Sequence, residues 1–158
     1  MIINSKYKFL KPFKVKKLIR LGRNYDGGYL LCNETLQNCE NLITLGVGDD
    51  ISFEIDFEKK RNSRSIRMYD YTVNNFLFIK IIFKYFRRLI TLRTKLDNFN
   101  NSIKNYINFI KFVRKKNVFL EKQRIVNKVK LSYDITLNNI LKKTHNKKNF
   151  LKIDIEGS

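Results

Sequence analysis

Two acidic residues in the stretch "FLKIDIEG", residues 150–157, stand in a pattern that could do chemistry. Apolar residues stand at positions 150, 151, 153 and 155, together with the acids Asp154 and Glu156 and a turn at Gly157. Side chains on one face of a strand recur at every second position, so the pattern predicts a buried strand that delivers carboxylates to a site. A carboxylate in such a place can hold a hydroxyl group and take its proton. Two plainer interpretations stay open: Asp154 caps a following helix, and Glu156 only hydrogen-bonds the turn.

A glycine-rich loop earlier in the chain is a candidate binding site for a cofactor. "GVGDD", residues 46–50, follows the apolar run "NLITL" and precedes a stretch whose apolar residues have helical spacing. Glycine lets a backbone approach a ligand closely, and the first N–H groups of a helix point toward that ligand. A dinucleotide-binding loop would have a third glycine where this chain has Ile51, and Asp49 and Asp50 would repel a pyrophosphate. The loop therefore favours a cofactor with cationic groups, such as the ammonium and sulfonium of S-adenosylmethionine.

A third carboxylate lies where the ribose of a cofactor would be held. Asp70 ends the predicted strand "SIRMYD" and stands 22 residues after Gly48. At the end of the second strand of a nucleotide-binding sheet, a carboxylate can accept hydrogen bonds from both ribose hydroxyls of an adenosine. The alternative is that Asp70 is a turn residue at a strand end.

The sequence does not predict a metal site. Cys32 and Cys39 are the two cysteines and His145 is the one histidine, so the ligand spacing of a zinc site is missing. We expect the two cysteines to be reduced thiols and His145 to be a solvated loop residue.

The predicted elements alternate between strands and helices, which is typical of an α/β fold with a mainly parallel sheet. The first is an N-terminal hairpin of two short strands around the turn at Asp26, Gly27 and Gly28. The elements expected after it, in chain order, are a strand at 42–47, a helix at 51–58, a strand at 66–70, two helices within 76–116, a strand region at 117–133, a helix at 137–143 capped by Thr136, and a strand at 150–155.

The segment 76–116 differs from the rest of the chain, because it combines many aromatic residues with eleven basic residues and a single acid, Asp97. Its apolar spacing predicts two helices that separate near "DNFNN", residues 97–101. We interpret the segment as a basic aromatic helical insertion in a single domain that spans 1–158. Such an insertion covers one side of the cofactor site or docks on a membrane.

The formal net charge of +19 admits two explanations. A strongly basic protein can bind nucleic acid or an anionic membrane. Alternatively, a mutational bias toward A/T-rich codons raises the lysine content without any ligand, and the chain has neither alanine nor tryptophan. We expect peripheral contact with an anionic membrane through 76–116 and regard nucleic acid as the weaker candidate. With no signal peptide and no apolar run near the roughly 20 residues that cross a bilayer, a cytoplasmic location is expected.

Several motifs resemble one known family. "LITLGVGDDISFE", "MYDYT", "ITLNNIL" and above all "FLKIDIEGS" resemble the FkbM-type methyltransferases, which have the class I S-adenosylmethionine-dependent fold, and "RLGRNYDGGYLL" resembles the subset of that family with a DGGY hairpin. The resemblance covers most of the chain from about residue 19 to 158, apart from the basic aromatic segment. It implies that Gly46, Gly48 and Asp49 line the methionine part of the cofactor, that Asp70 holds its ribose, and that Asp154 and Glu156 lie near the transferable methyl.

The chain departs from the general class I pattern at two positions. Thr44 stands where an acid usually precedes the glycine loop, and Asp50 stands where a third glycine often follows it.

The resemblance also implies an activity and an architecture. The activity is transfer of a methyl group from S-adenosylmethionine to a hydroxyl of a small molecule or glycan, such as a sugar or a secondary metabolite. The architecture is a Rossmann-like class I methyltransferase sheet with strands in the order 3-2-1-4-5-7-6. Because 150–155 would be strand 4, we expect a partial domain in which the C-terminal half of the sheet is missing. A strand with apolar residues on both faces belongs in a sheet interior.

Two rival interpretations stay open. One is a non-enzymatic basic module that binds an anionic membrane or nucleic acid. The other is an inactive methyltransferase fragment.

Overall fold

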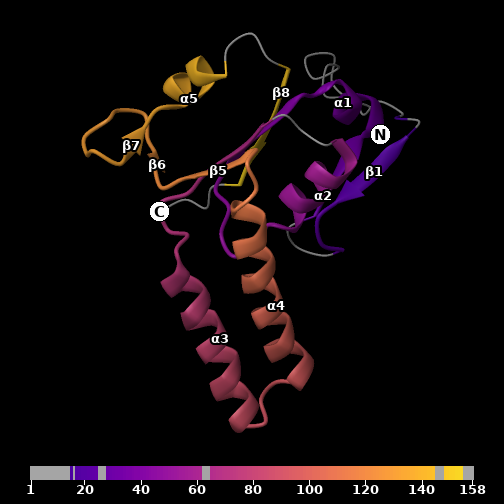
Figure 1. Ribbon diagram of the computed structural model, residues 1–158, viewed down its shortest axis with the longest axis vertical. Helices are drawn as coiled ribbons and strands as arrows, with labels where there is room; N and C mark the ends of the chain where they lie inside the picture. The colour runs from indigo at the N-terminus through magenta and orange to yellow at the C-terminus, as the bar shows by residue number, and fades with distance from the viewer. Residues whose placement is uncertain (1–14, 16, 25–27, 62–64, 145–147, 155–158) are drawn as a thin grey trace, which may run out of the picture.

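A four-stranded parallel sheet forms the centre of the molecule (Figure 1). The computed structural model describes residues 15, 17–24, 28–61, 65–144 and 148–154. The strand order of the sheet is β5-β4-β3-β8. The bounds of these strands are Val118–Glu121 for β5, Ser65–Tyr69 for β4, Asn41–Leu45 for β3 and Asn149–Ile153 for β8.

Strand β3 is the strand that the rest of the sheet is built around. It pairs in parallel with β4 on one side and with β8 on the other, and all five of its residues are buried. Leu42 faces one cluster of buried apolar side chains, whereas Ile43 and Leu45 face another. Parallel strands of this kind are covered on both faces, which explains the continuous apolar run in the sequence.

Different elements cover the two faces of the sheet. Helices α1 (Asn33–Asn38) and α2 (Ser52–Arg61) lie on one face, together with the bases of two longer helices (Figure 1). The other face is covered by α5 and by a two-stranded parallel ribbon of β6 and β7. These three elements are β6 (Arg124–Ile125), β7 (Asp134–Ile135) and α5 (Leu137–Lys143).

An antiparallel hairpin of β1 (Leu18–Leu21) and β2 (Tyr29–Cys32) precedes the sheet, as the sequence predicts. The expected turn residues Asp26 and Gly27 lie outside the described residues. Gly28 lies inside them, and a Cβ atom there would come within 1.9 Å of the Arg23 carbonyl oxygen. Any side chain at this position would therefore force the hairpin apart.

Helices α3 (Asn75–Ile90) and α4 (Leu96–Val113) run side by side and extend away from the sheet as a helical hairpin (Figure 1). The prediction of two helices is confirmed, but the predicted break near 97–101 is wrong, because the helices separate at 91–95. Asp97 instead occupies the first turn of α4, where its charge favours the helix dipole. The Asn98 side chain donates a hydrogen bond to the Thr94 hydroxyl at 2.9 Å.

Strand β8 departs from the expectation of a strand that is apolar on both buried faces. Phe150 does pack against the core, but Leu151 and Ile153 are exposed, and the buried side chain of the strand is Lys152. Leu151 and Ile153 pair with Ile43 and Leu45 on the face that α5 covers. On that face, α5 and the ribbon of β6 and β7 pack on β3 and β4. Within the described residues β8 is an edge strand, so its side chains on this face stay exposed.

A test of the core compares two phenylalanines. Phe57 is completely buried on α2, with its ring 5.7 Å from that of Phe150 between centroids, whereas Phe83 on α3 is 60% exposed. We expect Phe57→Ala to lower the free energy of unfolding by about 3–5 kcal/mol. The matched change Phe83→Ala should alter it by about 0.5 kcal/mol or less. Urea titrations of both variants measure the difference, and equal losses would contradict the assignment of the core.

Candidate functional site

A cavity of about 640 Å³ lies at the carboxyl ends of the parallel strands. After β3, the chain adds β4 and then β5 on one side of β3, and it later adds β8 on the other side. The direction in which strands are added therefore reverses between β3 and β8. Ligands of open α/β sheets bind at such a switch point. Five of the residues that the sequence analysis selected line this one cavity, namely Gly46, Gly48, Asp49, Asp70 and Asp154.

The glycine loop bends sharply between β3 and α2. Gly46 and Gly48 have φ angles of 78° and 61°, a left-handed conformation that other residues adopt at a cost. The Gly46 N–H donates to the Tyr69 carbonyl oxygen at 3.0 Å, which ties the loop to β4. A Cβ atom at Gly48 would meet nothing within 4 Å. Backbone conformation, rather than lack of space, is therefore the reason for glycine at position 48.

Asp70 holds the loop in this conformation. Its Oδ2 atom accepts hydrogen bonds from the backbone N–H groups of Val47 at 2.8 Å and Gly48 at 3.0 Å. Its Oδ1 atom accepts from the N–H and the hydroxyl of Thr72 at 2.8 and 2.6 Å. Burial by itself would raise the pKa of this carboxyl, but these hydrogen bonds outweigh burial and hold its pKa below the ordinary value. Four donors fill the roughly four acceptor positions of a carboxylate.

Asp154 lies at the other side of the cavity, directly after β8. Its backbone N–H donates to the Leu45 carbonyl oxygen at 2.8 Å, which fixes its position beside β3. The Tyr29 hydroxyl donates to Asp154 Oδ2 at 2.9 Å, so the N-terminal hairpin contributes to the site. The Asp154 side chain is about half exposed and is open to a second ligand. Glu156, the other acid expected here, lies outside the described residues.

A buried ion pair lies at the wall of the cavity, and no pattern in the sequence predicted it. Lys152 Nζ lies 3.2 Å from Glu54 Oε1, and both side chains are almost completely buried. The Thr44 hydroxyl donates to the same Glu54 oxygen at 3.0 Å. Burial raises the pKa of the Glu54 carboxyl, although the nearby Lys152 ammonium opposes the shift. In the sequence, the acid Glu54 and the base Lys152 each stand among apolar residues that are expected to be buried.

Aromatic rings and a cation stand at the rim of the cavity. Tyr71 stacks on Tyr133 with ring centroids 6.4 Å apart and planes 20° apart. The Arg124 guanidinium lies over the Tyr133 ring at 5.4 Å and forms an ion pair with Asp134 at 2.9 Å. That hydrogen-bonded pairing lowers the pKa of the Asp134 carboxyl and raises that of Arg124. Tyr71 and Arg124 line the cavity, where they can hold a planar ring of a ligand.

The charges around the cavity favour a cation. Each of its three basic side chains faces an acid: Arg23 faces Asp50 at 3.1 Å, and Arg124 and Lys152 are paired as described above. Asp49 is exposed at the cavity wall, and within the described part of the chain no ion pair involves it. The uncompensated charge of the lining is therefore negative.

The remaining sequence expectations concern the cysteines and the histidine. Cys32 and Cys39 are both free thiols, as predicted. His145 lies outside the described residues. Among the residues that the structure describes, no group of three or more His, Cys, Asp or Glu side chains could hold a metal ion.

Comparisons with known proteins give no relative: no family model, curated protein or solved structure matches the chain. None of the described helices combines the length and the apolar character needed to cross a membrane.

The role of Asp70 in the loop gives a prediction about stability and pH. Asp70→Asn replaces an acceptor of four hydrogen bonds by an amide whose NH₂ group faces N–H donors, so we expect a loss of about 1.5–3 kcal/mol in the free energy of unfolding at pH 7. The pKa of folded Asp70 lies below that of an unfolded aspartate, about 3.9. The carboxylate therefore stabilises the fold above that pH, and this contribution is lost as the pH falls through the folded-state pKa.

Urea titrations of wild type and Asp70→Asn between pH 7 and pH 3 measure the difference, which should shrink toward acid pH. Asp49→Asn is the matched control, because a change at the exposed Asp49 side chain should give a small difference in the free energy of unfolding. A difference for Asp70→Asn that does not depend on pH would contradict the assigned role.

Proposed function

We propose that this chain is an S-adenosylmethionine-dependent methyltransferase with a Rossmann-like class I fold, which methylates a hydroxyl group of a small molecule or glycan. The observation that carries the proposal is the convergence of the glycine loop, Asp70 and Asp154 on one cavity at the switch point of the sheet. The observed order β5-β4-β3-β8 is compatible with strands 3-2-1-4 of a class I sheet. The FkbM-like motifs described above supply the further support.

The residues around the cavity fit this cofactor. A volume of about 640 Å³ is within the usual range for ligand pockets. Asp49, which has no ion-pair partner among the described residues, supplies a carboxylate for an ammonium or sulfonium group, and the rim of Tyr71 and Arg124 suits a planar base. When bound, S-adenosylmethionine supplies a methyl group activated by its positively charged sulfur.

A nicotinamide dinucleotide fits less well. Ile51 occupies the position of the third glycine, and its side chain is buried in the core beside α2. Asp49 would also face the pyrophosphate, and like charges repel each other, whereas the charge of Asp50 is compensated by Arg23.

Asp70 holds the ribose in this proposal by exchanging one of its present hydrogen bonds. The bonds from Val47 and Gly48 maintain the loop, whereas the bond from the Thr72 hydroxyl comes from a rotatable side chain. A ribose hydroxyl can take the place of that hydroxyl at Oδ1 without opening the loop.

Asp154 orients the acceptor in this proposal. The Tyr29 hydroxyl occupies Oδ2, so Oδ1 is left to accept a hydrogen bond from the acceptor hydroxyl. The acceptor oxygen would bond to the methyl carbon as the carbon–sulfur bond of the cofactor breaks, the demethylated cofactor would leave as a neutral thioether, and the acceptor proton would pass to Asp154. Holding the oxygen in line with the methyl group supplies much of the acceleration. Glu156 follows two residues later and is proposed for the same side of the site.

The first test is cofactor binding by titration calorimetry. We expect the chain to bind S-adenosylmethionine or its demethylated product and not NAD. Asp49→Asn should weaken binding of S-adenosylmethionine by about 10-fold, because it removes the unpaired charge at the cavity wall. Asp97→Asn removes the same charge on the distant helical hairpin and should leave binding unchanged. Binding of NAD without binding of S-adenosylmethionine would overturn the proposal.

The second test concerns methyl transfer to hydroxyl acceptors. A panel of sugars and glycans is incubated with the protein and with cofactor that carries a radioactive methyl group. For any acceptor that is methylated, Asp154→Asn should lower the rate by about 10²–10⁴-fold, the usual contribution of a general base. Cofactor affinity should stay within about 2-fold of wild type. An undiminished rate would remove Asp154 from the catalytic role.

A further inference from the structure

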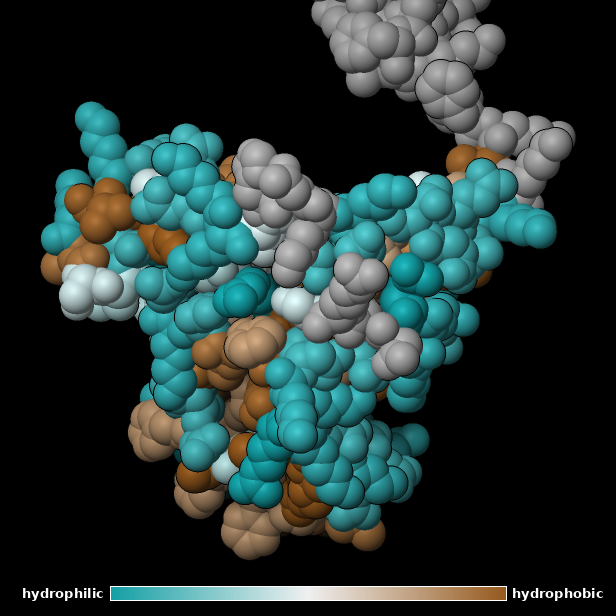
Figure 2. Space-filling model, turned by 45° about the horizontal axis from the view of Figure 1, so that its top comes forward, coloured by the Kyte–Doolittle hydropathy of each residue, from teal (hydrophilic) through white to brown (hydrophobic). Residues whose placement is uncertain are grey.

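A row of large apolar side chains lies in solvent along α3. Its members are between 44% and 66% exposed. They are spaced alternately three and four residues apart, which keeps them on one face of the helix. Figure 2 shows apolar side chains gathered in its lower part, over the helical hairpin. We call this row the α3 stripe, and its residues are Phe76, Ile79, Phe83, Phe86 and Ile90.

The α3 stripe is not the face that holds the hairpin together. The buried ring of Phe78 stacks on Tyr106 and lies 4.5 Å from the ring of Phe109 between centroids. Within the stripe, the ring of Phe86 also contacts Phe99 at 5.9 Å. Because α4 already packs on another face of α3, the stripe is a second apolar surface of the same helix.

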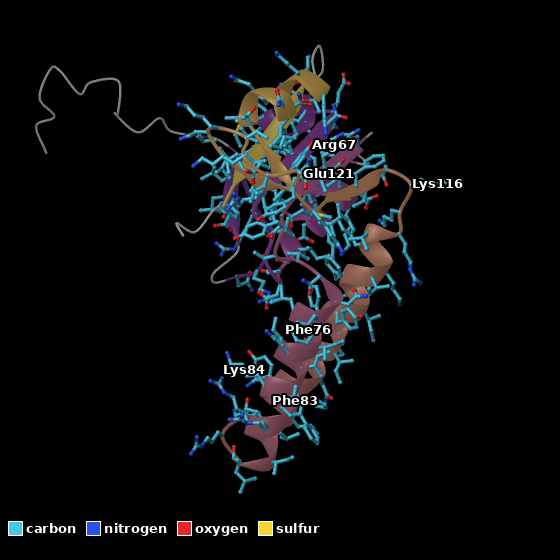
Figure 3. All side chains as sticks on the ribbon, turned by 90° about the vertical axis from the view of Figure 1, so that its left-hand side faces the viewer. Arg67, Phe76, Phe83, Lys84, Lys116 and Glu121 are labelled. Carbon is cyan, nitrogen blue, oxygen red and sulfur yellow. The ribbon has the colours of Figure 1, made fainter. Side chains whose placement is uncertain are left out.

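Basic residues follow one flank of the stripe. Lys80, Lys84 and Arg87 recur at positions i, i+4 and i+7 and are exposed. The Lys80 ammonium lies 4.5 Å from the centroid of the Phe76 ring, so this charge sits directly beside an apolar member of the stripe. Figure 3 shows Phe76, Phe83 and Lys84 along the same helix.

The tip of the hairpin continues the apolar surface away from the sheet. Leu92 is 91% exposed and has a φ angle of 53°, which is uncommon for a residue with a side chain. Leu96, at the start of α4, is also exposed. The tip is the part of the hairpin farthest from the sheet, so it is accessible to a large partner (Figure 1).

An anionic lipid surface matches these features better than the other candidate partners. A second copy of the chain would bring two basic flanks together, and the segment 76–116 offers one acid, Asp97, to neutralise them. A nucleic acid would match the bases, but it would leave aliphatic side chains such as Ile79 and Leu92 in water. A bilayer interface accepts the apolar side chains in its acyl boundary and the bases among its headgroups.

We propose that the helical hairpin of α3 and α4 is an interfacial anchor for an anionic membrane. The α3 stripe and Leu92 enter the acyl boundary, while Lys80, Lys84 and Arg87 stay at the level of the lipid phosphates. The hairpin lies in the interface and does not span the bilayer.

Vesicle binding by the whole chain tests the proposal. We expect binding to vesicles of phosphatidylcholine with about one third phosphatidylserine, and much weaker binding to phosphatidylcholine alone. The double change Ile79→Ser with Phe83→Ser should weaken binding by at least about 10-fold, because two exposed apolar side chains are lost from the interface. Phe119→Ser is the matched control, since Phe119 is an exposed phenylalanine on β5 outside the hairpin, and it should leave binding unchanged.

The basic flank is tested in the same assay. Lys80→Gln with Lys84→Gln should lower the affinity by about 5-fold for each charge removed. Lys59→Gln with Lys60→Gln removes two exposed charges from α2 and should change the affinity by less than about 2-fold.

A fluorescent reporter gives a direct measure of insertion. The chain has no tryptophan, so Phe83→Trp introduces a single one. Its emission should shift to the blue and be quenched by brominated lipids, whereas that of Phe119→Trp should not. The proposal is overturned if anionic vesicles do not bind, if the serine variants bind as tightly as wild type, or if the reporter is not quenched. It is also overturned if the stripe instead drives self-association or binding to a single-stranded oligonucleotide. Cofactor affinity is measured separately, so failure here leaves the methyltransferase proposal standing.

Discussion

The geometry of the candidate site depends on the hydrogen bonds that the Asp70 carboxylate accepts. The loop after β3 turns through two left-handed glycines, and this turn leaves the N–H groups of Val47 and Gly48 without a partner in the sheet. A buried N–H group must be satisfied, and a buried carboxylate is costly without donors. The N–H groups and the carboxylate satisfy each other here, because β4, the strand next to β3, is followed by Asp70, whose carboxylate lies beside the loop. The loop conformation and the depressed pKa of Asp70 are therefore two results of one set of contacts.

The ion pair of Lys152 with Glu54 stabilises the side of the cavity formed by the end of β8. The Lys152 ammonium enters the interior between β8 and α2, where Glu54 and the Tyr29 and Phe53 rings surround it. A buried charge of this kind is tolerated only with a partner, so α2 is held at a fixed distance from β8. The Thr44 hydroxyl donates to the same Glu54 oxygen, so β3 is tied to α2 as well.

The sequence predicted those parts of the fold in which local pattern and tertiary packing agree. The run at 42–47, the Asp70 strand and the helix capped by Thr136 all form as expected, because their apolar spacing matches the faces that the sheet covers. The break between α3 and α4 was misplaced because asparagines, which interrupt many helices, here occupy the first turns of one. The burial of β8 was misread because apolar residues on both faces of a strand do not reveal which face another element covers. Lys152 was overlooked for a related reason: its partner Glu54 is 98 residues away in the chain.

The distribution of charge along the chain bears on whether the net charge of +19 comes from codon bias alone. The segment 76–116 holds eleven of the 33 basic residues and one of the 14 acids, so it contributes +10 of the net +19. A codon bias toward lysine would act along the whole chain, and it does not remove acids from one segment. Around the cavity, by contrast, every basic side chain of the lining faces a carboxylate. At the base of the hairpin, Lys115 is likewise paired with Glu58 at 2.7 Å. Along α3, by contrast, Lys80, Lys84 and Arg87 are exposed beside apolar side chains that are themselves 44–66% exposed. Codon bias accounts for the abundance of lysine, but it does not account for a row of exposed apolar side chains flanked by basic side chains on one helix.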